Sequence, residues 1–190
     1  ASVISDCELE ALHAGGVRGL RFGIELARGM RPDYLEIFAE RIAPLGWHVQ
    51  YRSTEEDLPM LAERMIRLPV QVVVDHIGSI RPESGLNHPA FVALMKMVDG
   101  GKCWVKLSAA YQLSRIGAPC YSDYRAMAIK LVEAAPDRML WGTNWPHPKV
   151  EVMPNDTDLL ETLLDWSKND AVRKQILVDN PTKLYGFPND

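Results

Sequence analysis

The chain has 190 residues, of which 47% are hydrophobic and 24% are charged, and its formal net charge is −4. This composition is typical of a globular protein with a sizeable core, and mild acidity without basic runs argues against nucleic acid or an anionic membrane surface as a partner. No apolar run approaches the ~20 residues of a membrane span, and the first residues lack a signal-peptide pattern, so we expect a cytoplasmic protein.

Short β-rich runs alternate with helical patterns along the whole chain. We predict strands at 17–22, 47–52, 70–76, 103–108 and 139–144. We predict helices at 6–16, 33–46, 55–68, 89–98, 124–136, 157–168 and 170–180. Alternating strands and helices predict an α/β protein with a parallel sheet that is covered by helices.

The number of strand–helix units indicates part of a barrel. The run VQVVV at 70–74 is apolar almost throughout, as expected of a strand buried on both faces. An eight-unit barrel needs ~250 residues, and five units would leave an open sheet edge. We therefore predict a (β/α)8 TIM barrel of which about the last five β/α units are present. Residues 1–190 would form the C-terminal part of this single barrel domain.

Neither the cysteines nor the histidines are spaced as metal ligands. Cys7, Cys103 and Cys120 are odd in number and are expected to be reduced, buried thiols. No His-x-His, His-x-x-x-His or Cys-x-x-Cys occurs, and zinc needs three or four ligands. Phosphate-binding glycine loops and a Gly-x-Ser-x-Gly nucleophile motif are also absent from the sequence. We expect no metal and no other cofactor.

Polar residues at the ends of the predicted strands are the candidates for a functional site, because catalytic groups in a parallel α/β barrel gather there. Residues two positions apart on a strand share a face. In the third strand, one face should carry Val70, Val72, Val74 and His76. The mouth of the barrel should then collect Arg21, His76, Lys106 or Ser108, and Asn144, with Gln50 as a further member.

Each of these residues also has a purely structural interpretation. His76 could form a simple hydrogen bond with its neighbour Asp75. Lys106 is costly to bury alone and could form an internal salt bridge instead of contacting a substrate. Arg21 could pair with a carboxylate between helices, and Asn144 could brace the turn that follows it.

Six motifs follow one another along the chain, namely GVRGLRF, LGWHVQ, VVVDHIG, GKCWVKLSAAYQLS, APDRMLWGTNWPHP and DNPTKLYGF. Together they resemble the amidohydrolase superfamily, and more narrowly its amidohydrolase-2 branch, which contains 2-pyrone-4,6-dicarboxylate lactonase and related sugar-lactone enzymes. The resemblance covers essentially all 190 residues. It implies a (β/α)8 barrel in which the five strands here are strands four to eight. The family's first strand carries a His-x-His pair that this chain lacks.

The resemblance also implies roles for individual residues. His76 matches a histidine that polarises the lactone carbonyl, and Arg21 matches an arginine that binds a substrate carboxylate. Arg115 falls near a further anion-binding arginine, and Asn144 stands where hydrolytic members carry an aspartate. The predicted site therefore has His76 and Asn144 as catalytic residues, and its substrate-binding residues are Arg21, Gln50, Lys106, Ser108 and Arg115.

The implied activity is metal-independent hydrolysis of a carboxylated cyclic ester, so the expected partner is a small-molecule lactone. Asn144 leaves alternatives open, because an amide cannot take a proton from water as a carboxylate can. The protein could hydrolyse lactones with another base, such as His76. It could instead be an intramolecular lactone isomerase, in which a substrate hydroxyl attacks the carbonyl and Asn144 orients the substrate. A third alternative is a catalytically incomplete remnant.

Overall fold

Five parallel strands form one sheet in the computed structural model, which describes residues 4–23, 30–148 and 150–188. The strands are β1 (Gly19–Gly23), β2 (His48–Arg52), β3 (Val72–Val74), β4 (Cys103–Ser108) and β5 (Met139–Gly142). Their order is β1-β2-β3-β4-β5, so every strand pairs with its neighbours in sequence. The predicted alternation of strands and helices around a parallel sheet is confirmed.

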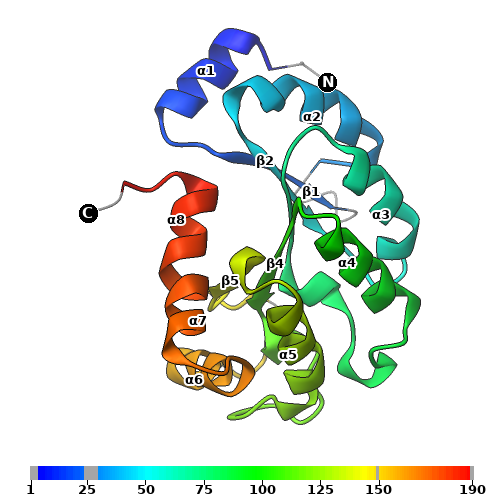
Figure 1. The fold of residues 1–190 in the computed structure, drawn as a ribbon, viewed down its shortest axis with the longest axis vertical. Helices are drawn as coiled ribbons and strands as arrows, with labels where there is room; N and C mark the ends of the chain where they lie inside the picture. Colours follow the sequence, from blue (N-terminus) through cyan, green and yellow to red (C-terminus); the bar gives the residue numbers. More distant parts are fainter. Residues whose placement is uncertain (1–3, 24–29, 149, 189–190) are drawn as a thin grey trace.

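Helices follow one another around the outside of this sheet (Figure 1). The chain returns from one strand to the next through α2 (Leu35–Ile42), α3 (Leu58–Arg67), α4 (Pro89–Asp99) and α5 (Arg125–Ala134). α1 (Asp6–Ala14) precedes the sheet, and α6 (Asp156–Trp166), α7 (Asp170–Lys174) and α8 (Asn180–Tyr185) follow it. A π-helical turn at Gln175–Asp179 joins α7 to α8, so the helix predicted to end at 180 continues to Tyr185.

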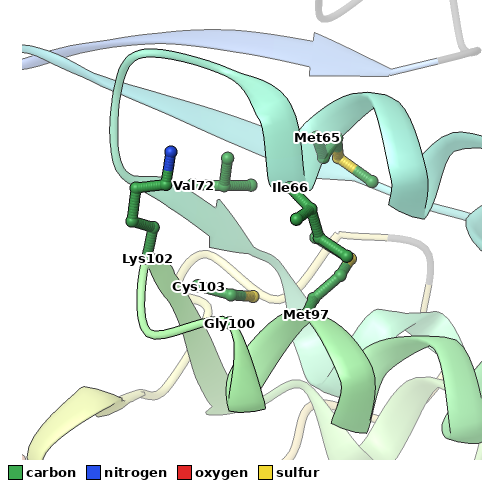
Figure 2. Close-up of a pocket in the computed structure, with 7 residues that line it drawn as sticks. All are labelled: Met65, Ile66, Val72, Met97, Gly100, Lys102 and Cys103. Carbon is green, nitrogen blue, oxygen red and sulfur yellow. The ribbon is translucent and has the colours of Figure 1, made fainter.

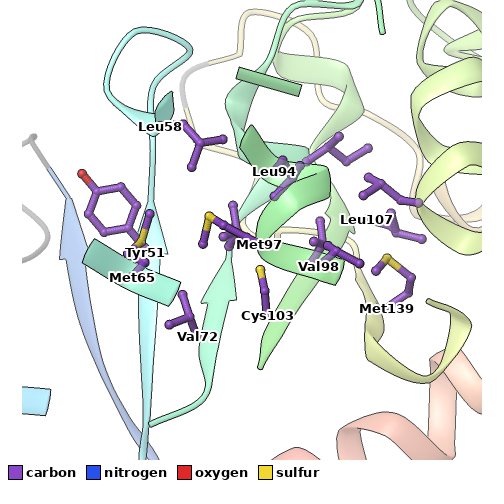
Figure 3. Close-up of a cluster of buried hydrophobic side chains, with 14 of the residues drawn as sticks. Tyr51, Leu58, Met65, Val72, Leu94, Met97, Val98, Cys103, Leu107 and Met139 are labelled. Carbon is purple, nitrogen blue, oxygen red and sulfur yellow. The ribbon is translucent and has the colours of Figure 1, made fainter. Parts of the chain in front are cut away.

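The main hydrophobic core lies between the sheet and the helices that surround it. Strand residues such as Tyr51, Val72 and Leu107 pack there against Met65 of α3 and Leu94 of α4 (Figure 3). Each fully buried side chain of this size stabilises the fold by about 1.5–3 kcal/mol. This core therefore fixes the strands and the loops that leave their C-terminal ends.

A second, smaller apolar cluster covers the opposite face of the sheet. It consists of Val73, Trp104 and Leu140, with Leu184 of α8 packed against it. Buried Asn180, at the start of α8, donates hydrogen bonds of 2.7 Å to the carbonyl oxygens of Pro136 and Met139. The DNP motif thus fastens α8 to the beginning of β5.

The third strand faces the opposite way from the prediction. Val72 and Val74 belong to the core beneath the helices, whereas Val73 lies in the cluster on the other face. Asp75 is still extended, with φ −72° and ψ 143°, and continues the alternation on the Val73 face. The prediction that Val72 and Val74 share a face with His76 at the site is therefore wrong. The residues of this strand that face the site are Val73 and Asp75, one position away from those predicted.

A small cavity lies in the core beside a buried cysteine. A cavity of about 10 Å³ lies between α3, α4 and the two strands that follow them, and it has room for about one water molecule (Figure 2). Cys103 is buried beside it, but Cys7 and Cys120 are exposed, so the prediction of three buried thiols is wrong for these two.

Within the described residues, no helix combines the length and the hydropathy needed to cross a membrane.

Candidate active site

Asp75 is the centre of a charged cluster at the C-terminal end of the sheet. Its side chain is 1% exposed, and its carboxylate lies 3.0 Å from Arg21 Nη2 on β1 and 3.4 Å from Lys106 Nζ on β4. Gln50 Nε2 on β2 donates to both carboxylate oxygens at 3.0 Å. Strands β1, β2 and β4 therefore each direct a polar side chain at Asp75, the residue that follows β3.

The cluster keeps Asp75 ionised. Burial by itself raises the pKa of this carboxyl, but the positive charges of Lys106 and Arg21 and the hydrogen bond from Gln50 hold it below its usual range. Arg21 and Gln50 were predicted to converge with Lys106, and the structure brings these three together. The salt-bridge interpretation of Lys106 corresponds to its contact with Asp75.

His76 reaches the same mouth through a left-handed turn. The values of φ are 55° for His76, 51° for Ile77, 70° for Gly78 and 52° for Ser79, a conformation that is costly for residues other than glycine. The turn brings His76 Nδ1 to 2.8 Å from Ser108 Oγ at the end of β4. His76 and Ser108, which were each predicted as site residues, are thus hydrogen-bonded to each other.

The imidazole of His76 is neutral at pH 7. Burial lowers its pKa to about 4. The positive charges of Arg52, Lys106 and Arg21 also lower this pKa, whereas the negative charge of Asp75 raises it. A neutral imidazole has one N–H donor and one acceptor nitrogen. If Nδ1 accepts a hydrogen bond from the Ser108 hydroxyl, Nε2 carries the N–H donor.

Asn144 holds a tyrosine at the mouth. Its backbone is left-handed, with φ 65°, and its Nδ2 donates a hydrogen bond of 2.7 Å to Tyr111 Oη. The ring of Tyr111 packs edge-on against His147, with centroids 5.4 Å apart, and His147 Nε2 lies 2.8 Å from Asp156 Oδ1. The backbone carbonyl oxygen of Asn144 also accepts a hydrogen bond of 2.9 Å from the backbone N–H of His147, so Asn144 braces the turn as well.

Arg115 is the one predicted site residue that lies apart from these groups in the described structure. Its guanidinium pairs with Glu83 at 2.7 Å, and its side chain is 76% exposed. Its backbone N–H donates to Asp123 at 2.8 Å.

Sequence reasoning did not assign three residues to this site. Asp75 was considered only as a partner of His76, because the phase of β3 was misread. Arg52 lies two residues after Gln50, so simple alternation along β2 would have found it. Tyr111 lies on a 3₁₀ turn, Ala110–Gln112, where no periodic pattern applies.

The described residues contain no group of three or more His, Cys, Asp or Glu side chains that could hold a metal ion. The described part of the site offers hydrogen-bonding groups and fixed charges. Arg21, Arg52 and Lys106 supply positive charge, Asp75 supplies negative charge, and His76 supplies a neutral donor and acceptor.

Two buried histidines predict a loss of stability in mild acid. Burial lowers the pKa values of both His48 and His76 to about 4 from an ordinary value of about 6.5. Between these values the unfolded chain binds more protons than the folded one, so the free energy of unfolding falls as pH falls. We expect a loss of up to about 3 kcal/mol per histidine between pH 7 and pH 4.

Urea denaturation of the protein at pH 7, 5.5 and 4.5 measures this loss. The variant in which both histidines are glutamine removes the two titrating groups and should have a clearly flatter pH dependence. Equal slopes in the wild type and the double variant would show that other groups cause the acid sensitivity.

Comparisons with known proteins identify relatives of this chain. Residues 4–187 match the Amidohydrolase family. The chain is 38% identical, over 193 aligned positions, to 2-pyrone-4,6-dicarboxylate hydrolase of Comamonas testosteroni, covering 96% of this chain and 63% of that protein. It is 35% identical to 4-sulfomuconolactone hydrolase of Hydrogenophaga intermedia, covering 94% and 61%. It is 32% identical to D-galactarolactone isomerase of Agrobacterium fabrum, covering 94% and 62%.

Solved structures show the same fold. A crystal structure from Agrobacterium tumefaciens has a TM-score of 0.85 and 30% identity, and it matches 98% of this chain and 67% of its own. A crystal structure from Pseudomonas putida has a TM-score of 0.83 and 28% identity, and it matches 100% of this chain and 71% of its own. The chain thus spans between 61% and 63% of the length of the three curated relatives named above.

Proposed function

Because the chain belongs to the amidohydrolase family, we propose that it supplies half of the active site of an enzyme that hydrolyses a carboxylated lactone. The observation that supports this most is the mouth itself, where positive charges, a neutral histidine and a tyrosine meet at the C-terminal ends of parallel strands. Two relatives at 35% and 38% identity are named as lactone hydrolases. The substrate of this protein, and the activity of the whole molecule, are part of the proposal.

We also infer that the five β/α units are consecutive units of an eight-unit barrel. Their sequential parallel order is that of barrel strands, and the solved relatives are longer than this chain. The remaining strands would complete the wall of the same mouth. A His-x-His pair preceding Ala1 in the natural sequence would support this arrangement.

His76 is proposed to polarise the lactone carbonyl. With Nδ1 accepting a hydrogen bond from Ser108, Nε2–H can donate to the carbonyl oxygen, where negative charge develops during attack. The low pKa of His76 favours this neutral form at pH 7. Asp75 fixes the positions of Arg21, Gln50 and Lys106, whose remaining N–H groups are proposed to bind the substrate.

A second candidate function is intramolecular lactone isomerisation, and Asn144 is the observation that favours it. An amide has no pKa that would allow it to take a proton from water. Its Nδ2 is instead directed at Tyr111, a group that can orient a substrate hydroxyl by hydrogen bonding. A relative at 32% identity is named as a lactone isomerase.

Labelled water separates the two reactions. The natural protein, with any residues that precede Ala1, is incubated with 2-pyrone-4,6-dicarboxylate and with galactarolactone in ¹⁸O water, with and without a chelator. Ring opening with one ¹⁸O in the product, unaffected by the chelator, supports metal-independent hydrolysis. An ester that migrates without label supports isomerisation, and no turnover of either lactone rejects both.

A further inference from the structure

Arg52 is a cation at the mouth with no acidic partner in the described structure. It is the last residue of β2, opposite Gly23 of β1. Because it is two residues after Gln50, it lies on the face that carries the Asp75 cluster. No ion pair or side-chain hydrogen bond joins it to any residue that the structure describes, although it is only partly exposed.

Neighbouring cations each contact a carboxylate, which distinguishes Arg52 from them. Arg21 and Lys106 share Asp75 at 3.0 and 3.4 Å. Arg81 pairs with Glu55 at 2.8 Å. A partly buried guanidinium without a counter-charge costs free energy, and an anionic ligand would remove that cost.

The position of Arg52 relates it directly to the proposed chemistry. Its charge acts on both His76 and Tyr111, in each case in the direction of a lower pKa, although burial is the largest influence on both groups. The guanidinium therefore lies within electrostatic reach of both sides of the mouth. An anion held by Arg52 would be presented to the same mouth.

A cavity beside Arg52 offers space for such an anion. Its volume is about 250 Å³, and most of its lining residues are polar, among them Arg52, Ser53, Thr54, Ser79, Arg81 and Gln112. Glu55 and Glu56 also line it, and Arg81 lies 2.8 and 4.0 Å from their carboxylates. Arg81 is held by these carboxylates, whereas no described carboxylate pairs with Arg52, so the Arg52 guanidinium is free to bind a ligand in this cavity.

We propose that Arg52 binds a carboxylate of the lactone, separate from any carboxylate that Arg21 contacts, and so determines specificity for doubly acidic lactones. This inference rests on the proposed lactone activity. A guanidinium binds a carboxylate through two parallel hydrogen bonds, so the contact selects both charge and geometry. A lactone that lacks this carboxylate gains nothing from Arg52.

Substrates that differ by one carboxylate test the assignment. Arg52→Gln should raise KM for 2-pyrone-4,6-dicarboxylate by roughly 10- to 100-fold, with little change for one of the two monocarboxylates, 2-pyrone-4-carboxylate or 2-pyrone-6-carboxylate. Arg52→Lys should recover only part of the loss, because an ammonium cannot form the paired contact. The exposed, paired Arg125, changed to glutamine, is the matched control and should leave all three KM values unchanged.

The outcomes separate this inference from the proposed function. Turnover with equal KM changes for all three pyrones, or with no change, overturns the role of Arg52 and leaves the lactone activity standing. If no pyrone is turned over, the proposed function fails, and calorimetric binding decides about Arg52. Selective loss of dicarboxylate binding in Arg52→Gln then still supports the anion site, whereas equal or absent binding overturns it.

Discussion

Asp75→Asn is expected to lower the free energy of unfolding by about 3 kcal/mol, the lower end of the range for breaking a buried ion pair. The change removes the negative charge between Arg21 and Lys106 while their side chains stay close together. The loss is limited because these side chains are 35% and 24% exposed and can gain water. Urea denaturation at pH 7 measures it.

Activity should fall in the same variant. Asp75 positions three side chains at the mouth, and displacement of such groups by about 1 Å typically costs roughly 100-fold in rate. The rate is measured at a temperature where the variant remains folded by circular dichroism. A proportional fall in folded protein and activity would instead assign Asp75 to stability alone.

Asp57 provides a matched control for this experiment. It is also buried, and it accepts hydrogen bonds from the Tyr51 hydroxyl at 3.1 Å and the Thr54 N–H at 2.9 Å. Burial raises the pKa of Asp57, whereas the pKa of Asp75 is lowered. Neutralising Asp57 should therefore cost less than neutralising Asp75. Equal stability of the two asparagine variants would contradict the role given to the cations.

If the protein is the isomerase of the second candidate function and has no other general base, Asn144→Asp is expected to raise the rate at which water opens the lactone by about 10²- to 10⁴-fold, the usual contribution of a general base. The side-chain volume hardly changes, and the new carboxylate would accept a hydrogen bond from the Tyr111 hydroxyl, whereas the Asn144 amide donates one to it. The added negative charge should weaken binding of an anionic substrate, which KM would report. The rate is measured with ¹⁸O water so that hydrolysis is counted separately from isomerisation.

Two further variants identify the cause of such a gain. Asn144→Ala removes the hydrogen bond to Tyr111 without supplying a base, so hydrolysis should not rise. Tyr111→Phe in the Asn144→Asp background keeps the base and removes its partner. An unchanged hydrolysis rate in Asn144→Asp would show that another group, such as His76, already serves as the base.

The order of elements and the direction of the sheet could be predicted because each unit carries its own signal. Helical periodicity and β-rich runs alternate five times, and only a parallel sheet with outer helices accommodates that pattern. Arg21, Gln50 and Lys106 were brought together correctly because they lie within strands, where alternation decides the face.

The phase of the third strand could not be read in the same way. VQVVV is apolar on both faces, so the two possible phases look alike in sequence, and a slip of one residue reverses every side chain. The correct phase is visible only in the pairing of Val73 with Gln50 and Trp104. Asp75 was consequently treated as a neighbour of the site instead of its centre.

The conformations of residues beyond the strand ends were harder to predict than the phase of a strand. His76 and Asn144 adopt left-handed conformations, and nothing in their own identities requires this. Gly78 is different, since φ is 70° and a Cβ there would lie 2.9 Å from Leu58 Cδ2. Tyr111 depends on a short turn whose geometry comes from tertiary contacts.

The left-handed run that begins at His76 has a consequence for protein engineering. Adjacent residues of an extended strand point to opposite faces, yet Asp75 and His76 both contact groups at the mouth, because the backbone changes handedness between them. The pair is therefore not a portable sequence motif. Transplanting an Asp-His dipeptide to the end of another barrel strand would deliver only one of the two side chains, unless the loop through Ser79 and the space beside Gly78 were transferred with it.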